Sequence, residues 1–222
     1  MELNSPTPLI YLVDDEFAVR DSLTLFIEST GRQIKSFDSA QAFLNDYDTK
    51  QPGCLILDVK MPSMTGHELQ EELTARSITI PIIFISGNAD IPDSARAFRA
   101  GAVDFLEKPF DNDLLLARVD EAIKKDLDAR YQLAEKNKIQ ERFERLTERE
   151  KQVLQLIVNS HSNKEAARIL DISHRTIDAH RARVMEKMQA DNITKLIAMV
   201  MSHNLVESKP LDAPFIDKLS TE

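Results

Sequence analysis

The chain has 222 residues, of which 42% are hydrophobic and 29% charged, and its formal net charge is −9. A hydrophobic fraction of this size supports packed cores, while the lack of any 18-residue apolar stretch excludes a membrane span. One cysteine cannot form an internal disulfide, and no Cys/His cluster has the spacing of a zinc site. We expect no secretory signal and a cytoplasmic location.

The charge is distributed unevenly along the chain. Residues 1–124 carry 11 basic and 21 acidic side chains, net −10, whereas residues 146–206 carry 9 and 7, net +2. This asymmetry indicates two domains with different tasks, the second of them mildly basic.

Residues 9–110 alternate between apolar runs and segments with helical periodicity, five times over. This pattern predicts an α/β domain of about residues 8–123, with a five-stranded parallel (βα)5 sheet doubly wound by helices on both faces. The apolar runs are Leu9–Val13, Ile34–Phe37, Cys54–Leu57, Ile80–Ile85 and Val103–Leu106.

Residues 124–145 contain no glycine or proline and are rich in good helix formers. We predict that the last helix of the first domain continues into a long, mostly exposed helical linker. A charged flexible tether is the alternative. Residues 207–222 are predicted to form a mobile tail.

Residues 146–206 have a helical pattern throughout. The segments Thr147–Glu150 and Ser162–Glu165 have the capping-box pattern that begins a helix. A tight turn at 171–173 then precedes a helix that begins near His174. Two short helices joined by a tight turn predict a small all-α helix-turn-helix domain.

Polar side chains stand at the ends of the predicted strands. Asp14 and Asp15 end the first run, Asp58 the third and Ser86 the fourth, and Lys108 follows the fifth. The carboxyl ends of parallel strands face one crevice, so we expect these groups to converge. Taken alone, Asp58 could also be a solvated loop acid or a helix cap.

Clustered carboxylates favour a hard cation, and Mg²⁺ prefers oxygen ligands and phosphate. We predict that Asp15 and Asp58, with Asp14 assisting, hold Mg²⁺, and that Asp58 attacks a phosphorus atom in line. Lys108 would pair with a phosphoryl oxygen, and Ser86 would donate a hydrogen bond to the new phosphate.

Separated motifs, in a fixed order along the chain, resemble the receiver domain of bacterial response regulators across residues 8–123. They are Val13–Glu16, Leu57–Pro62 with Gly66, Ile85–Gly87, and Glu107–Phe110.

The resemblance implies that a sensor histidine kinase donates a phosphoryl group to Asp58, and that the backbone carbonyl of Lys60 is a further Mg²⁺ ligand. It also implies a cis bond before Pro109 and a switch formed by Ser86 and Phe105. An ordinary strand-end hydroxyl at Ser86 and an ordinary core aromatic at Phe105 are the alternatives.

The second domain resembles the LuxR-type helix-turn-helix, and the chain to about residue 206 resembles the NarL/FixJ family, in its FixJ-like branch. Two residues depart from the family pattern, since Ser160 stands where glycine is usual and Ala166 replaces a larger aliphatic residue. The resemblance is carried by Leu146–Glu150, Asn163–Glu165, Arg175–Arg181 and, for the branch, Gly101–Phe105.

Candidate DNA contacts follow from the helical step of 100° once the apolar side of the helix from His174 faces inward. Phosphate contacts supply most non-specific affinity, so a net charge of +2 makes one copy a weak binder. We therefore expect two copies on two half-sites, paired through the last helix, 193–205. With Ile177, His180, Val184 and Met188 inward, the candidates for base edges are Arg175, Asp178, Ala179, Ala182 and Arg183, and those for phosphates are Lys164, Thr176, Arg181 and Lys187.

These features predict a phosphorylation-regulated transcription factor that catalyses only its own phosphoryl transfer and dephosphorylation. Its expected partners are a sensor histidine kinase, promoter DNA and a second copy of itself when phosphorylated or on DNA, with RNA polymerase as a further candidate and no membrane. An enzyme with a regulated catalytic output is the first alternative, although residues 146–206 lack a triad, a metal cluster and a glycine-rich phosphate loop. A pure protein-interaction module is the second.

Overall fold

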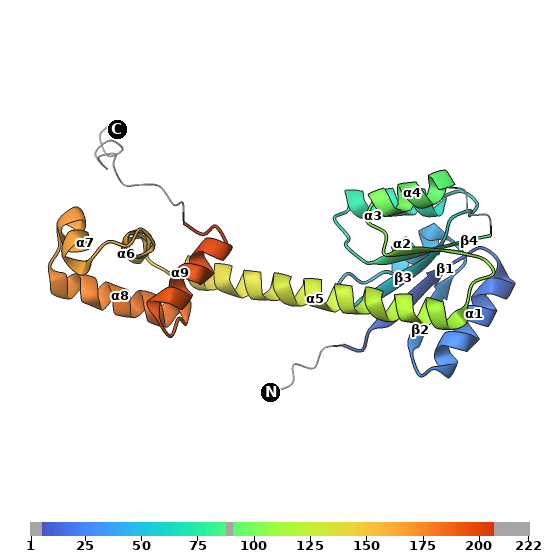
Figure 1. Cartoon of the computed structure of the whole chain (residues 1–222), viewed down its shortest axis with the longest axis horizontal. Coiled ribbons are helices and arrows are strands. Elements are labelled where there is room, and N and C mark those ends of the chain that lie inside the picture. Colours follow the sequence, from blue (N-terminus) through green and yellow to red (C-terminus); the bar gives the residue numbers. More distant parts are fainter. Residues whose placement is uncertain (1–5, 88–90, 207–222) are drawn as a thin grey trace. The chain divides into compact units, whose positions relative to one another are not determined.

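The computed structural model describes residues 6–87 and 91–206, which form two compact units, Met1–Tyr131 and Gln132–Glu222 (Figure 1). Within the first unit, the described residues form a five-stranded parallel sheet with the order β2-β1-β3-β4-β5. This confirms the predicted α/β class and sheet. The strands are β1 (Leu9–Val13), β2 (Gln33–Phe37), β3 (Gly53–Asp58), β4 (Ile82–Ser86) and β5 (Asp104–Glu107).

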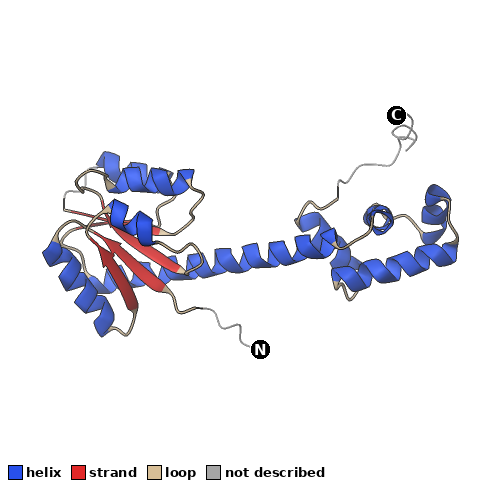
Figure 2. Cartoon of the chain, turned by 180° about the vertical axis from the view of Figure 1, so that it is seen from behind, coloured by secondary structure: helices blue, strands red, loops and turns tan. Residues whose placement is uncertain are grey.

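Helices cover both faces of this sheet (Figure 2). One face packs against α1 (Phe17–Ser29) and α5 (Asn112–Glu144), and the other against α2 (Ala40–Asp46), α3 (Gly66–Ala75) and α4 (Ile91–Arg99). Two separate apolar clusters result, one on each side of the strands. The sheet is therefore buried on both faces, which explains why its central strands are continuous apolar runs rather than alternating ones.

The central strands are the most deeply buried. All six residues of β3 are buried, including Asp58 at its carboxyl end, and all five of β4 are buried, including Ser86 at its end. Parallel pairing aligns Val13 with Leu57, and Asp58 with Ile85. The polar residues that end these strands therefore lie along one edge of the sheet, as the sequence predicts.

The second unit contains four helices after α5 within the described residues. They are α6 (Glu148–Val158), α7 (Asn163–Leu170), α8 (His174–Met188) and α9 (Ile193–Ser202). Both predicted capping boxes are present, at Thr147 with Glu150 and at Ser162 with Glu165. Side chains from all four helices, joined by Ile139 of α5, enclose one apolar core.

The predicted linker, 124–145, lies almost entirely within α5, which runs without a break to Glu144. Most of its residues are exposed, but Asp126 is buried in the first unit and Ile139 in the second. The two compact units divide after Tyr131, within the predicted linker. The tail predicted at 207–222 lies outside the described residues. No helix in the described part of the chain has both the length and the apolarity to span a membrane.

Candidate functional site

Lys108 brings two buried carboxylates together at the carboxyl edge of the sheet. Its Nζ lies 2.7 Å from Asp14 Oδ2 and 2.7 Å from Asp58 Oδ1. Asp14 is fully buried and Asp58 is only 5% exposed. These three groups come from the ends of β1 and β3 and from the turn after β5, so the sheet topology alone makes them neighbours.

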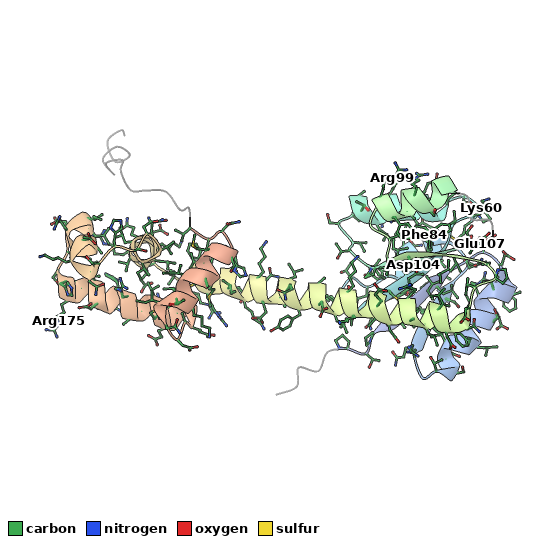
Figure 3. All side chains as sticks on the ribbon, viewed as in Figure 1. Lys60, Phe84, Arg99, Asp104, Glu107 and Arg175 are labelled. Carbon is green, nitrogen blue, oxygen red and sulfur yellow. The ribbon has the colours of Figure 1, made fainter. Side chains whose placement is uncertain are left out.

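Backbone N–H groups orient the remaining carboxylate oxygens. Lys60 N donates to Asp58 Oδ2 at 2.7 Å, and Glu16 N donates to Asp14 Oδ1 at 2.8 Å. The peptide bond between Lys108 and Pro109 is cis, as the family resemblance implies. In Figure 3, the labels of Lys60 and Glu107 mark the end of the sheet at which the site lies.

The electrostatics of the site follow from two carboxylates, Asp14 and Asp58, that share one ammonium group, Lys108. Burial raises the pKa of Asp58, and the nearby Asp14 charge adds to this, which together outweigh the lowering by Lys108 and by the N–H of Lys60. Burial lowers the pKa of Lys108. The hydrogen bonds and charges of Asp14 and Asp58 raise it by more, so the net shift of the Lys108 pKa is upward. Lys108 is therefore a permanent cation, and Asp58 is a carboxylate whose negative charge is costly in this position.

The donor set fits a hard divalent cation. Two buried carboxylates already hold one cationic group, the Lys108 ammonium, and every side-chain donor is oxygen. Asp15 follows Asp14 directly and is exposed to solvent, and its role as a metal ligand stays a prediction. Among the residues that the structure describes, no group of three or more Asp, Glu, His or Cys side chains is placed to hold a metal ion.

The two predicted switch residues lie beside the site on β4 and β5. Ser86 is 1% exposed, and its carbonyl accepts the N–H of Lys108 at 2.7 Å. Phe105 is half-buried and stacks on Phe84, with ring centroids 6.3 Å apart. Phe84 in turn packs against His67 of α3, at 5.1 Å between centroids. An aromatic row thus joins α3 to β5 through β4.

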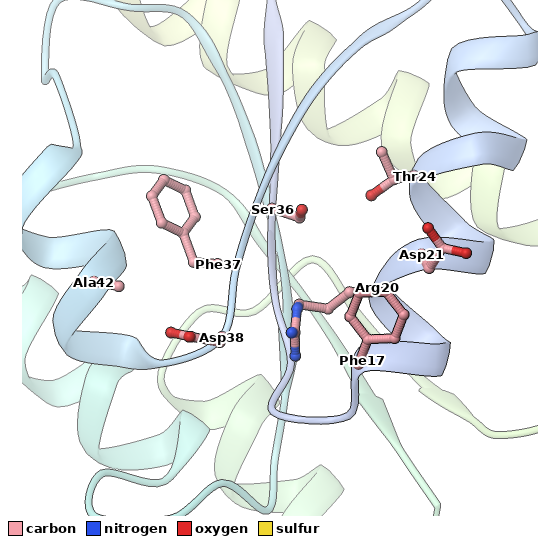
Figure 4. Close-up of a pocket in the computed structure, with 8 residues that line it drawn as sticks. All are labelled: Phe17, Arg20, Asp21, Thr24, Ser36, Phe37, Asp38 and Ala42. Atoms are coloured by element: carbon pink, nitrogen blue, oxygen red, sulfur yellow. The ribbon is translucent and has the colours of Figure 1, made fainter.

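A pocket of about 430 Å³ opens next to the site, between α1 and the end of β2 (Figure 4). Neither Asp58 nor Lys108 lines it. Arg20, which does, donates from Nη1 to the main-chain carbonyl of Asp14 at 2.8 Å. Arg20 could not be predicted from the sequence, because a contact to a main-chain carbonyl leaves no motif. The pocket is lined by Phe17, Arg20, Asp21, Thr24, Ser36, Phe37, Asp38 and Ala42.

In the second unit, α8 presents the predicted outer face to solvent. The side chains of Ile177, Val184 and Met188 are buried, and His180 is half-buried, as the helical step predicts. Figure 3 shows Arg175 projecting from the start of α8. The candidates for base edges, Arg175, Asp178, Ala179, Ala182 and Arg183, are exposed, as is Lys164, while Thr176 and Arg181 are half-buried.

Three of the candidate DNA contacts have side-chain partners inside the domain, and for Thr176 the partner is Ser173, with 2.7 Å between the two hydroxyl oxygens. Lys187 Nζ lies 2.6 Å from Glu150 Oε2 and donates to the carbonyl of Arg145 at 3.1 Å. Its contact with phosphate stays a prediction, and one that requires Lys187 to leave Glu150. Asp178 accepts a hydrogen bond from Asn163 Nδ2 at 2.5 Å, which ties α8 to the start of α7.

Two family models match the chain. The response regulator receiver domain matches residues 10–120, and the bacterial regulatory proteins of the luxR family match residues 144–200. The first match contains the whole Asp14–Asp58–Lys108 cluster, and the second contains the helices α6 to α8. A receiver domain implies a histidine kinase as partner, and a LuxR-type domain implies DNA binding.

The similarity to known relatives extends over most of the chain and includes both domains. The chain is 41% identical over 189 residues to the response regulator protein TodT of Pseudomonas putida F1, covering 85% of this chain and 83% of TodT. It is 41% identical over 192 residues to the transcriptional regulatory protein FixJ of Bradyrhizobium diazoefficiens, covering 86% and 94%. The solved structure of the response regulator StyR is 38% identical, with a TM-score of 0.84, over 89% of this chain and 100% of StyR. The chain belongs to the NarL/FixJ response regulators and is a phosphorylation-regulated transcription factor of a two-component system.

Proposed function

We propose that Asp58 is the phosphoacceptor of this response regulator. The observation that carries the proposal is the Lys108 ammonium, held 2.7 Å from both Asp14 and Asp58 at the end of the buried strand β3. An oxygen of Asp58 would attack the phosphorus of a phosphohistidine on the sensor kinase. The phosphorus–nitrogen bond would break, and the electron pair would return to the imidazole nitrogen, which takes a proton from water.

We propose Mg²⁺ as the cofactor, held by Asp14, Asp15, Asp58 and the carbonyl of Lys60. Bound Mg²⁺ would neutralise charge on the phosphoryl oxygens. The buried carboxylates of Asp14 and Asp58 support this, because they already accept a cation. Once the acyl phosphate has formed, the Lys108 ammonium would leave the Asp58 carboxylate and form an ion pair with a phosphoryl oxygen instead.

The acceptor assignment is tested by labelling the full chain with a small-molecule phosphodonor in the presence of Mg²⁺. Asp58→Asn is expected to abolish the label, and a chelator is expected to abolish it in the unaltered protein. Asp38→Asn serves as a matched control, because Asp38 is exposed and has no contact with Lys108. Normal labelling of Asp58→Asn would refute the assignment.

Ser86 and Phe105 are proposed to carry the phosphorylation signal from the site to β5. Ser86 is buried at the end of β4, next in the sheet to both β3 and β5. A new phosphate at Asp58 would attract the Ser86 hydroxyl, and the space this leaves would allow the half-buried Phe105, which already stacks on Phe84, to turn further inward. Ser86→Ala is expected to retain labelling at Asp58 but to lose most of the phosphorylation-dependent gain in DNA affinity.

The second domain is proposed to bind promoter DNA as a dimer. Two copies would pair through α9, with Ile193 and Met201 on its exposed side, when the receiver is phosphorylated or when both copies occupy half-sites. RNA polymerase is a further proposed partner at the promoter. The proposed DNA contacts are those predicted from the sequence: Lys164, Arg175, Thr176, Asp178, Ala179, Arg181, Ala182, Arg183 and Lys187.

The DNA contacts are tested by titrating a duplex that the phosphorylated protein selects from a random-sequence pool, at several salt concentrations. If Arg175 contacts a base edge, Arg175→Ala is expected to weaken binding by about 1–3 kcal/mol and to relax specificity at one position. If it contacts phosphate, the salt slope falls by about one instead. Lys151→Met is the control, since Lys151 pairs with Glu148 on α6. Unchanged affinity for Arg175→Ala would remove Arg175 from the interface.

A further inference from the structure

Asp126 is a buried carboxylate on α5, at a position that the sequence places in an exposed linker. The residue is only 3% exposed. Its Oδ2 accepts a hydrogen bond from the backbone N–H of Gly53 at 2.9 Å and another from Arg130 Nε at 2.7 Å. Burying a carboxylate is costly unless it has hydrogen-bond and charge partners, and Gly53 and Arg130 supply both for Asp126.

Arg130, one helical turn later, extends the contact to the loop before β3. Its Nη1 donates to the carbonyl of Thr49 at 2.9 Å, and its Nη2 donates to the carbonyl of Gln51 at 3.0 Å. We name the Asp126 and Arg130 side chains, with the main-chain groups of Thr49, Gln51 and Gly53 that they bind, the Asp126–Arg130 clasp. Three backbone groups in five consecutive residues are thereby held by one turn of α5.

Gly53, which donates to Asp126, is held tightly against the neighbouring strand β1. A Cβ atom at Gly53 would lie 1.8 Å from the carbonyl oxygen of Leu9, so β3 starts in direct contact with the backbone of β1. Leu9 N also donates to the carbonyl of Pro52 at 2.9 Å. The Gly53 N–H that donates to Asp126 is therefore a fixed part of the sheet, and the two carbonyls that accept from Arg130 lie in the loop directly before it.

The clasp differs from the exposed ion pair that lies one to two turns later on α5. Glu135 and Lys138 form an i,i+3 pair at 2.6 Å, but both side chains are more than one-third exposed, and neither bonds a backbone group of another element. An exposed pair of that kind contributes little. The clasp instead combines a buried charge with bonds to residues about 75 positions away in the chain, so its loss has consequences beyond the helix surface.

The clasp and the proposed phosphoacceptor lie at opposite ends of one strand. Strand β3 runs from Gly53 to Asp58, and each of its six residues is buried. We propose that the Asp126–Arg130 clasp holds α5 to the start of β3, and that through this hold the receiver controls the helix that leads to the DNA-binding domain. Asp126 and Arg130 are thus positioning residues, and the inference rests on the proposed function of Asp58.

The same geometry assigns the segment of α5 in which the helix can bend. Residues up to Tyr131 belong to the receiver unit, and burial resumes at Ile139 in the core of the second unit. Between them, residues 132–138 contribute no buried side chain to either unit. With the clasp closed, bending is confined to 132–138, whereas with the clasp open it extends back to about residue 124.

The test compares three variants of the full chain, Arg130→Met, Asp126→Asn and Arg130→Lys, with Lys138→Met as the matched control. Each is labelled with a phosphodonor and titrated, with and without phosphorylation, against a duplex selected from a random pool by the phosphorylated unaltered protein. Amide hydrogen exchange is followed at Gly53 and across 124–138. Lys138→Met removes a lysine from the same helix without touching the clasp.

Arg130→Met and Asp126→Asn are expected to label at Asp58 within twofold of the unaltered protein. Gly53 and residues 124–131 are expected to exchange at least tenfold faster, and the phosphorylation-dependent gain in DNA affinity is expected to fall at least fivefold. Arg130→Lys keeps the positive charge but can make fewer hydrogen bonds, so its exchange rates and its gain in DNA affinity should lie between those of Arg130→Met and the unaltered protein. It serves as the test if Arg130→Met does not fold. Lys138→Met should match the unaltered protein in all three measurements.

Two results would overturn the inference while leaving the proposed function intact. One is a full gain in DNA affinity in Arg130→Met despite accelerated exchange at Gly53. The other is unchanged exchange at Gly53 in both Arg130→Met and Asp126→Asn. If the unaltered protein and Lys138→Met also show no gain on phosphorylation, the proposed function fails first, and the inference fails with it.

Discussion

Glu150 of α6 and Lys187 of α8 form an ion pair with 2.6 Å between Oε2 and Nζ. Glu150 is 2% exposed and also accepts the backbone N–H of Thr147 at 2.8 Å. One carboxylate therefore closes the capping box of α6 and fastens α8 to it. Burial alone would raise the pKa of Glu150, but the hydrogen bonds from Lys187 and Thr147 outweigh it and hold the pKa below the ordinary 4.5.

We predict that Glu150→Gln lowers the free energy of unfolding of the second unit by about 2 kcal/mol at pH 7, because it leaves Lys187 without its counter-charge. Because the folded pKa lies below the unfolded one, the stabilisation by Glu150 is present above pH 4.5 and is lost as the pH falls through the folded pKa. Urea unfolding followed by hydrogen exchange in α6 and α8 measures both effects. Glu148→Gln, whose side chain is 85% exposed, should change the stability by less than about 0.5 kcal/mol.

Asp58→Asn is predicted to stabilise the receiver at pH 7 by about 1 kcal/mol, since it removes a buried charge that burial and Asp14 disfavour. The raised pKa of Asp58 means that stability falls as the pH rises from 3.8 through the folded pKa, so the advantage of the variant should shrink toward pH 4. Urea unfolding at pH 7 and pH 5 measures it. A variant less stable than the unaltered protein would mean that the ion pair with Lys108 outweighs the cost of burial.

Gly66→Ala is predicted to cost about 2 kcal/mol and to slow labelling at Asp58. A Cβ atom there would lie 2.3 Å from the carbonyl oxygen of Asp58 and 3.0 Å from Phe84 Cε1, so the backbone that presents the carboxylate must shift. Gly87→Ala is the control, because a Cβ atom at Gly87 meets nothing within 4 Å. Thermal unfolding and the initial labelling rate measure the two effects. Equal behaviour of the two variants would contradict the steric explanation.

Ser160→Gly is predicted to stabilise the second unit by about 0.5–1 kcal/mol. Ser160 has φ of +60°, a left-handed conformation that is costly for any residue with a Cβ atom. Ser162→Gly is the matched substitution two residues later, where φ is −67° and the hydroxyl caps α7. It should lose about 0.5 kcal/mol. Chemical denaturation of the two variants is expected to give shifts of opposite sign.

Features with a local signal were predictable from the sequence. Strands β1, β3 and β4 are short apolar runs, and Asp14, Asp58 and Lys108 could be placed together because parallel strands share one carboxyl edge. The inward face of α8 followed from the helical step. Even the unusual turn at Ser160, where the family usually has glycine, agrees with a left-handed residue.

Features that depend on long-range partners were not predictable. Asp126 and Arg130 have the spacing of an ordinary surface i,i+4 pair, and nothing in their neighbours reveals that the acceptors are backbone groups near residue 50. Lys187 was grouped with exposed cations, because its partner Glu150 lies 37 positions earlier on another helix. Exposed and buried ion pairs have the same residues, so only the tertiary packing tells them apart.

The register of β1 against β3 limits which insertions the family can tolerate. Val13 pairs with Leu57, so Asp14 and Asp58 leave the sheet at the same level. Side chains alternate along a strand, and one added residue within β1 or β3 would turn one of these acids to the opposite face. Loops that carry no residue of the site are free of this constraint and can lengthen. In β1 and β3, by contrast, a single-codon insertion would separate one of the two acids from Lys108, and we expect it to abolish labelling at Asp58.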